Sequence, residues 1–366
     1  MRIRAFVVDD ERPARERLRQ LLRTFEDVDV IGEAGDGEEA IQSIREAGPD
    51  LVFLDVQMPG RSGLEVAASL AAPRPSVVFC TAFDDYAIRA FELHAVDYLL
   101  KPVNRSRLAE TVQRTRRSLS DSRELRQDLE SARQVQTRLF PRALPQFDAL
   151  DYSGACLPAK SVGGDYYDFL SFSPTRIGIA LADVSGKGMA AGLLMASLQG
   201  RLQSRVAAYG TDVAGLMSEL NREILRTTEG SRFITMFYGV YDRDRQTLTY
   251  VNAGHNPPLF FEAEMRRLEC GGPLLGCLEG IGFEQEVVPM KAGDTLLAFS
   301  DGITEAFNAN EEEFGEARLR SILESSARLT AEALRDRILV EVGAFTGGGA
   351  PHDDQTLVVV KVRGKP

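Results

Sequence analysis

Short apolar runs alternate with amphipathic segments through residues 1–122. The runs lie at 3–8, 28–31, 51–54, 77–80 and 98–100. Between them, segments such as 13–25 repeat apolar residues at helical spacing, as in Leu18, Leu21, Leu22 and Phe25. Strands that alternate with helices favour a parallel sheet covered on both faces. The pattern therefore predicts an α/β, doubly wound domain with a five-stranded parallel sheet.

A long helix is predicted next, because residues 104–140 contain neither glycine nor proline. Apolar or small residues recur in steps of four and three, first at Leu108, Val112, Thr115, Leu119 and Ser122, and then in a shifted phase at Leu125, Leu129, Ala132, Val135 and Leu139. This spacing is typical of a coiled coil with one change of register near Ser122. We expect a coiled-coil linker that ends at Pro141 and Pro145 and pairs two chains in a homodimer.

The predicted helix is rich in arginine. Residues 105–145 hold ten arginines and five acidic residues, which is a local charge of +5. Because the net charge of the whole chain is −11, the remaining residues together carry −16. Two interpretations stay open. The arginines form a solvated helix face, or they meet an acidic surface on a neighbouring domain or partner.

From residue 146 onward, β-rich runs surround helical segments. Strands are indicated at 176–181, 236–241, 247–251, 258–261, 295–299 and 356–362, and helices at 190–206, 213–227, 316–325 and 331–344. This order favours an α+β domain with mostly antiparallel sheets. We therefore expect three segments, which are a first domain at 1–122, a helical linker at 123–145 whose helix starts near 104, and a second domain at 146–366.

Composition and charge narrow the classes of function. With 44% apolar and 27% charged residues, the 366-residue chain has the composition of ordered globular domains. The net charge of −11 argues against nonspecific binding to nucleic acid or to an anionic membrane. No apolar stretch approaches membrane-spanning length and no signal-peptide pattern is present, so we expect a cytoplasmic protein. The four cysteines occupy no metal-ligand spacing and are expected to be unpaired thiols.

Polar residues follow the strands of the first domain: Asp9 and Asp10, Asp55, Thr81 and Lys101. The carboxyl ends of parallel strands share one edge of a sheet, so these side chains should converge. Three crowded carboxylates call for a hard cation such as Mg²⁺ or Mn²⁺. One carboxylate can then attack phosphorus, while the lysine and the threonine stabilise the transferred group. The alternative, unrelated polar strand ends, is weakened by the agreement of all five positions.

The motifs VVDDE, FLDVQMPGRSG, FCTAF and DYLLKP follow one another in residues 1–122, and this segment closely resembles a response-regulator receiver domain. The resemblance implies phosphorylation by a partner histidine kinase and a cis peptide bond before Pro102. It also implies a role for each site residue: Asp55 as phosphoacceptor, Asp9, Asp10 and Asp55 as Mg²⁺ ligands, Lys101 as a phosphoryl contact, and Thr81 and Tyr98 as residues that reorient on phosphorylation.

Acidic residues recur in glycine-marked turns of the second domain, at Asp165, Asp183, Asp301 and the pair Asp353-Asp354. Three of these turns adjoin apolar runs, so strands should aim several carboxylates at one end of a sheet. Such a set without cysteine or clustered histidine suits Mg²⁺ or Mn²⁺ and not zinc. Two such ions can share a bridging water and clamp a displacement at phosphorus. The alternative is that these are ordinary Asp-Gly turns.

The motifs VGGDYYDF, ADVSGKGMAAGLLMA, NAGHNPPL, FSDGITEA and DDQTLVVV appear in order, and this half resembles the SpoIIE/RsbU branch of the metal-dependent PPM phosphatases, whose fold is a β-sandwich flanked by helices. The resemblance implies metal ligands at Asp165, Asp183, Asp301 and Asp353, with the Val184 carbonyl completing the set. Asp353 is favoured over Asp354 because it stands three residues before Thr356.

His255 lies in the NAGHNPP motif and has two interpretations. A histidine can be a general acid or a metal ligand. The first interpretation is therefore a functional histidine. The surrounding glycine, asparagine and prolines instead favour a histidine with a structural role, in a turn at the rim of the site.

Three functions are compared. The favoured one is a response regulator in which Asp55 controls a metal-dependent serine/threonine phosphatase. By resemblance, its substrate is a phosphorylated STAS-domain anti-anti-sigma factor. In this hypothesis helices 190–206 and 213–227 move Asp183 into place. The alternative is a non-catalytic adaptor with a phosphatase-like fold, which would not need Asp183 or Asp301. A DNA-binding regulator is disfavoured, because residues 146–366 are acidic and contain no basic recognition helix.

Overall fold

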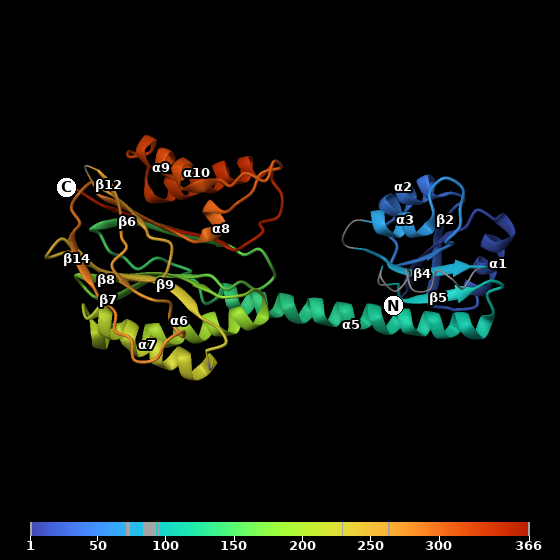
Figure 1. Cartoon of the computed structure of the whole chain (residues 1–366), viewed down its shortest axis with the longest axis horizontal. Helices are drawn as coiled ribbons and strands as arrows, with labels where there is room; N and C mark the ends of the chain where they lie inside the picture. Colours follow the sequence, from blue (N-terminus) through green and yellow to red (C-terminus); the bar gives the residue numbers. More distant parts are fainter. Residues whose placement is uncertain are drawn as a thin grey trace. The chain divides into compact units, whose positions relative to one another are not determined.

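The computed structural model describes residues 2–70, 74–82, 93, 95–228, 230–262 and 264–364 (Figure 1). The chain divides into two compact units, Met1–Gln127 and Asp128–Pro366. The predicted boundaries at 122 and 145 stay predictions. None of the helices in the described ranges is long and apolar enough to cross a membrane.

The first unit contains the predicted parallel sheet. Its strand order is β2-β1-β3-β4-β5, and every pairing is parallel. The strands are β1 (Ile3–Val8), β2 (Val28–Ala34), β3 (Leu51–Leu54), β4 (Ser76–Thr81) and β5 (Asp97–Leu100). Apolar clusters fill both faces of the sheet, one against α1 (Arg12–Leu22) and the start of α5 (Arg105–Thr137), the other against α2 (Gly37–Ala47) and α3 (Gly63–Ser69). The predicted α/β class is confirmed.

Local sequence explains where two of these helices begin. Asp36 caps α2 by accepting hydrogen bonds from the N–H groups of Glu38 and Glu39. Ser62 and Glu65 form a reciprocal capping box at the start of α3. Each cap satisfies backbone donors that a first helical turn leaves without partners. The caps therefore fix the loops that lead out of the sheet edge.

Helix α5 is one continuous helix of 33 residues, as the absence of glycine and proline predicts. Leu108 and Val112 at its start are buried in the core of the first unit, beside Leu22 and Leu99. This corrects the predicted seam, because these two residues pack inside their own unit and do not face a second chain. The coiled coil, its change of register near Ser122 and the dimer stay predictions for the later part of the helix.

The arginines at the start of α5 are not simply solvated. Arg107 and Arg114 lie 2.5 and 3.4 Å from the buried Asp97 carboxylate. Arg116 pairs with Asp27 at 2.7 Å. The acids in these contacts belong to the unit from which the helix emerges, and not to a neighbouring domain or partner, so both interpretations stay open for the later arginines.

The second unit contains two sheets. One has the order β13-β10-β9-β8-β7, with β14 also paired to β10, and the other has the order β12-β11-β15-β16-β6. The strands are β6 (Leu150–Leu157), β7 (Tyr166–Ser173), β8 (Arg176–Val184), β9 (Ile234–Asp242), β10 (Thr247–Ala253), β11 (Leu259–Phe261), β12 (Met265–Arg267), β13 (Gly271–Gly272), β14 (Glu286–Pro289), β15 (Thr295–Phe299) and β16 (Gln355–Val362). All pairings are antiparallel except the short one between β10 and β13.

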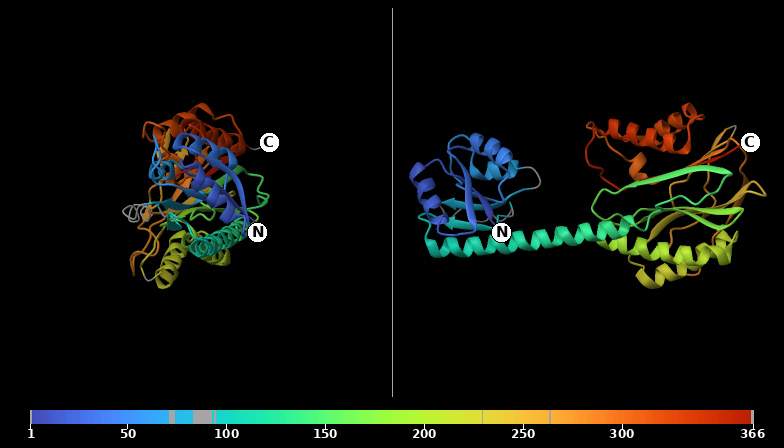
Figure 2. Two further views of the ribbon diagram at one scale, coloured as in Figure 1. Left: turned by 90° about the vertical axis from the view of Figure 1, so that its right-hand side faces the viewer. Right: turned by 180° about the vertical axis from the view of Figure 1, so that it is seen from behind.

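Helices cover both outer faces of this sandwich (Figure 2). They are α6 (Met189–Tyr209) and α7 (Val213–Thr228) on one side, and α9 (Gly315–Ser325) and α10 (Ala331–Phe345) on the other. The alternation of side chains along each strand explains these layers. In β15, Leu296 faces the core between the sheets while Leu297 faces α9 and α10. The predicted sandwich flanked by helices is confirmed.

Candidate functional sites

The carboxyl edge of the first sheet brings three predicted acids together. Asp9 and Asp10 follow β1 and Asp55 follows β3, and their carboxylate oxygens lie within 4.8 Å of one another. Asp9 and Asp55 are buried, whereas Asp10 is exposed. In the described part of the chain, this is the one group of three acids that meets this distance. Such an all-oxygen cluster, open on one side, fits a hard divalent cation.

Lys101 connects two of these acids. Its Nζ lies 2.7 Å from Asp9 Oδ2 and 2.6 Å from Asp55 Oδ2. Burial raises the pKa of Asp55, and the hydrogen bond from Lys101 opposes this without cancelling it. For Lys101 itself, burial lowers the pKa, but the two carboxylates outweigh burial and the net pKa is raised. Lys101 is therefore charged at neutral pH and compensates the crowded carboxylates.

The other predicted residues of the first site lie on the neighbouring strands. Thr81 is buried at the end of β4, in register with Leu100 of β5. Tyr98 of β5 is half-buried and packs against the α2–α3 side of the core. The peptide bond between Lys101 and Pro102 is cis, as predicted. The last residue of the FCTAF motif, Phe83, lies outside the described residues.

The acids of the second unit come from four different segments. Asp165 precedes β7, Asp183 lies near the end of β8, Asp301 opens the short helix α8 (Asp301–Thr304) after β15, and Asp353 precedes β16. These segments belong to both sheets, so the site sits at one end of the sandwich. Among the residues that the structure describes, no three of these acids approach one another as closely as the acids of the first unit.

Burial and mutual repulsion raise the pKa of these acids. Asp165 is fully buried, and burial together with the charge of Asp183 raises its pKa. Burial, and then the charges of Asp301 and Asp353, raise the pKa of Asp183 to about 6. Burial and Asp353 raise the pKa of Asp301. Carboxylates that destabilise one another in this way are what a bound cation would relieve.

One atom fits a metal ligand particularly well. Asp165 Oδ2 is buried and has no hydrogen-bond partner within the described ranges of the chain. A buried carboxylate oxygen without a donor is costly unless a cation neutralises it. The residues present therefore fit a hard metal ion, in agreement with the acid-rich motifs.

Asp353 and Asp354 have different environments. Asp354 accepts hydrogen bonds from the backbone N–H groups of Ala159 at 2.8 Å, Gly164 at 2.7 Å and Asp165 at 3.4 Å. It is 9% exposed, whereas the side chain of Asp353 is 45% exposed. Asp354 thus holds the loop that carries Asp165. Asp353 is the more exposed member of the pair, and its assignment as a metal ligand stays a prediction.

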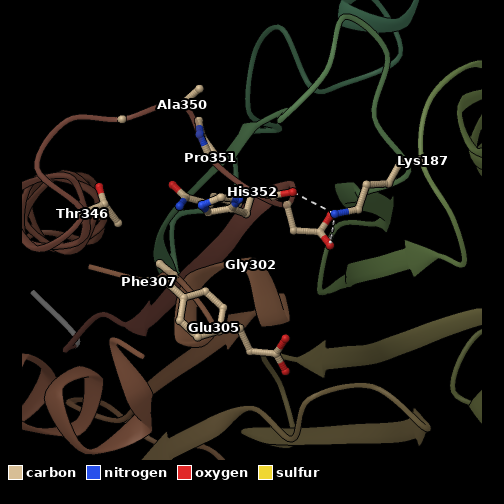
Figure 3. Close-up of a pocket in the computed structure, with 12 residues that line it drawn as sticks. Lys187, Gly302, Glu305, Phe307, Thr346, Ala350, Pro351 and His352 are labelled. Carbon is tan, nitrogen blue, oxygen red and sulfur yellow. Dashed lines mark hydrogen bonds and ion pairs between the residues drawn. The ribbon is translucent and has the colours of Figure 1, made fainter. Parts of the chain in front are cut away.

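Lys187 was not singled out from the sequence. It lies in the turn after β8, and its Nζ is 2.7 Å from Asp353 Oδ2 and 2.8 Å from the carbonyl oxygen of His352. Figure 3 shows the side chain reaching across to this segment, at the edge of a cavity of about 260 Å³. The sequence does contain a signal that could have identified this residue, because Lys187 lies between two glycines and four residues after the candidate ligand Asp183. Its charge can stabilise an anionic group at the site.

Val184 and His255 are both buried. Val184 is buried at the end of β8, and a Cβ atom on Gly164 would come within 2.9 Å of its carbonyl oxygen, so only glycine allows this approach. His255 is buried, with its Nδ1 2.9 Å from the Thr235 hydroxyl, and burial lowers its pKa to about 4. Asn252 bonds both the N–H and the carbonyl of His255. These are the contacts of a structural turn, and the histidine is neutral at pH 7.

Comparison with protein families matches both units. The family described as "Stage II sporulation protein E (SpoIIE)" matches residues 173–363, and the family described as "Response regulator receiver domain" matches residues 5–113. Residues 173–363 are more than half of the chain. The two matches follow the order of the two structural units.

Individual relatives agree with this division. "Phosphoserine phosphatase RsbU" of Bacillus subtilis (strain 168) is 31% identical over 274 residues, which are 73% of this chain and 79% of that protein. "Transcriptional regulatory protein BtsR" of Salmonella typhi is 50% identical over 119 residues, 32% of this chain, and the match spans half of that relative. The SiaA-PP2C domain of Pseudomonas aeruginosa is similar in fold, with a TM-score of 0.58 and 18% identity over 67% of this chain and 99% of that domain.

Proposed function

Because the chain belongs to the Stage II sporulation protein E family and carries a response regulator receiver domain, we propose that phosphorylation of Asp55 controls a PPM-type serine/threonine phosphatase in the second unit. The observation that carries this proposal is the set of mutually repelling acids around the unpartnered Asp165 Oδ2. The match to phosphoserine phosphatase RsbU covers 73% of this chain, which supports phosphoserine phosphatase activity.

We assign the metal ligands of the second unit to Asp165, Asp183, Asp301 and Asp353, with the Val184 carbonyl as a further ligand. Bound Mn²⁺ or Mg²⁺ ions, of which we expect two, would lower the pKa of a bound water and polarise the phosphoryl oxygens. Lys187 adds a positive charge at the same edge, where the phosphate of the substrate must enter. Asp354 keeps the Asp165 loop in place through its backbone hydrogen bonds.

In the receiver unit we assign Asp55 as the phosphoacceptor and Asp9, Asp10 and Asp55 as Mg²⁺ ligands. The phosphodonor is a histidine kinase. Lys101 lies 2.6 Å from Asp55 and would contact the new phosphoryl group. Thr81 and Tyr98 are the residues that respond, and the signal passes through α5. Paired α5 helices in a homodimer would then shift α6, which packs on the strand of Asp183, and α7, which packs on α6.

For the protein substrate we propose a phosphorylated anti-anti-sigma factor of the STAS-domain type. The decisive experiment measures Mn²⁺-dependent release of phosphate from such a protein. The full chain is tested with and without beryllofluoride, which mimics a phosphoryl group on Asp55. We expect hydrolysis whose rate differs between the two states. Absence of hydrolysis in both states contradicts the proposed activity, and equal rates contradict the proposed control.

The second candidate is a non-catalytic adaptor that binds the same client. It does not explain why buried acids are retained at a cost in mutual repulsion. The Asp183→Ala variant separates the two functions. An adaptor predicts that this variant still regulates its client in cells, whereas a phosphatase predicts that regulation is lost together with hydrolysis.

A further inference from the structure

The end of helix α5 is hydrogen-bonded to the loop that carries Asp165. Gln136 is 8% exposed, and its side-chain Nε2 donates to the carbonyl of Gly163 at 2.8 Å. Its Oε1 accepts from the Gly163 N–H at 3.0 Å. One side-chain amide therefore satisfies both backbone groups of a residue that lies 27 positions further along the chain. Buried backbone groups without partners are costly, so the loop position depends on this residue.

The same loop meets two further elements. A Cβ atom on Gly192 of α6 would lie 2.3 Å from Val162 Cγ1 and 3.1 Å from Gln136 Nε2, so α6 packs directly on the loop and on the glutamine. On its other side, Gly164 donates to Asp354 at 2.7 Å. The loop is thus fixed between α5, α6 and the segment that precedes β16.

We propose that Gln136 is a positioning residue for the metal centre: its two hydrogen bonds to Gly163 hold Asp165 where a metal ligand is needed. A displacement of the end of α5 would break these bonds and release the loop. This inference rests on the proposed function, since it assigns Asp165 to the metal. It adds a specific contact by which the linker helix acts on that ligand.

The test compares three chains: a reference chain that keeps both glutamines, Gln136→Met and the control Gln134→Ala. Methionine keeps the length and helix preference of glutamine but can form neither bond. Gln134 is exposed on the same helix turn. All three chains also carry Asp9→Asn and Asp10→Asn, so that Mn²⁺ bound by the receiver acids does not mask binding in the second unit.

Two measurements are made on these full-length chains. Hydrogen–deuterium exchange should become faster at residues 161–165 in Gln136→Met and stay unchanged in Gln134→Ala. Calorimetric titration with Mn²⁺ should show affinity that is about 10-fold weaker in Gln136→Met, as for other residues that orient metal ligands. The melting temperature of the metal-free protein is measured alongside, because a merely structural role would lower it without changing Mn²⁺ affinity.

Each result decides the inference. Unchanged exchange at residues 161–165 overturns it, and so does faster exchange with wild-type Mn²⁺ affinity. If Gln136→Met does not fold, Gln136→Glu replaces it, because glutamate still accepts from the Gly163 N–H but cannot donate to its carbonyl. Faster exchange and weaker Mn²⁺ binding are then still required. Neither measurement needs turnover, so a chain whose Mn²⁺ affinity depends on Gln136 but that hydrolyses nothing would contradict the proposed function alone.

Discussion

Both units gather carboxylates and place one lysine beside them, but they build these sites differently. In the first unit the acids follow adjacent parallel strands, and Lys101 connects Asp9 and Asp55 at 2.7 and 2.6 Å. In the second unit the acids come from four segments of two sheets, and Lys187 pairs with Asp353 at 2.7 Å. Lys101 is 19% exposed, whereas Lys187 is 42% exposed.

The difference shows how a sheet and a loop position the same kind of side chain. Strand ends in a parallel sheet fix the distance between acids through the strand spacing itself. In the second unit, the loop that carries Asp165 is held by two neighbours: the Asp354 carboxylate accepts from the Gly164 N–H, and the Gln136 amide bonds both backbone groups of Gly163. A site of that construction can be adjusted by moving one neighbouring element. The construction of the second site suits the regulated phosphatase activity proposed above. The first site, with its acids fixed by the sheet, suits the proposed phosphoacceptor.

The largest effect is expected from the acids of the second unit. Asp183→Ala should lower Mn²⁺-dependent phosphatase activity at least about 100-fold, because the ion that activates water loses a ligand. Initial rates of phosphate release from a phosphoserine protein measure this. The control is Asp244→Asn, an exposed acid in the turn after β9, which should behave as the unaltered chain does. Full activity in the Asp183→Ala variant would contradict the assignment of Asp183 as a metal ligand.

A similarly large effect is expected in the first unit, on a different reaction. Asp55→Asn should abolish incorporation of a phosphoryl group from acetyl phosphate, because an amide cannot replace the carboxylate nucleophile. Intact-protein mass spectrometry follows the modified fraction. Asp29→Asn, at an exposed position of β2, is the matched control. Modification that persists in the Asp55 variant would place the acceptor elsewhere.

The two lysines should differ in a smaller, measurable way. Lys187→Ala is expected to lower kcat/KM for the phosphoprotein about 10-fold, because a positive charge near the phosphate is lost. Mn²⁺ affinity should hold or increase, since Asp353 no longer pairs with an ammonium group. By contrast, Lys101→Ala leaves two buried acids without their shared cation. Weaker Mn²⁺ binding by Lys187→Ala would show that the lysine supports the metal site and does not compete with it.

The last effect concerns the stability of the first unit and is expected to depend on pH. Asp97 is buried, which by itself raises its pKa, but hydrogen bonds from Arg107 and Thr111 outweigh burial and the net pKa is lowered. A carboxyl group with a lowered pKa in the folded state stabilises the fold at pH values above its unfolded-state pKa. This stabilisation is lost as the pH falls through the folded-state pKa. Asp97→Asn should cost about 1–3 kcal/mol at pH 7 in urea unfolding. The difference from the unaltered chain should shrink below pH 4, and a difference independent of pH would exclude this linkage.

Sequence reasoning worked best where one element determines a position. The five parallel strands were predicted because each is a short apolar run, and the acids of the first unit were found because each follows such a strand. Strands β6 and β7 were missed because polar residues interrupt them. In β7, Asp168 is buried and accepts hydrogen bonds from Tyr166 on the same strand and from Gln203, a partner that only the tertiary fold supplies.

Residues whose role depends on distant partners could not be predicted. The buried position of Gln136 follows from a contact with Gly163, and the helical pattern around it gives no sign of a buried polar group. Leu108 and Val112 fit a coiled-coil seam by spacing, but the same spacing serves packing inside a domain. Periodicity identifies an apolar face, whereas the identity of its partner requires the fold.

The neighbouring aspartates before β16 have a consequence for how this chain tolerates insertions and deletions. Asp353 and Asp354 are chemically identical, and only the pairing of β16 with β6 and β15 decides which one faces the backbone N–H groups and which one faces Lys187. A slip of one residue exchanges the two faces of a strand. Loss of Gln355, the first paired residue of β16, would therefore move Asp353 into the position of Asp354 and bring His352, which has no carboxylate, to the position of Asp353. Strand alignment, and not residue identity alone, selects the ligand.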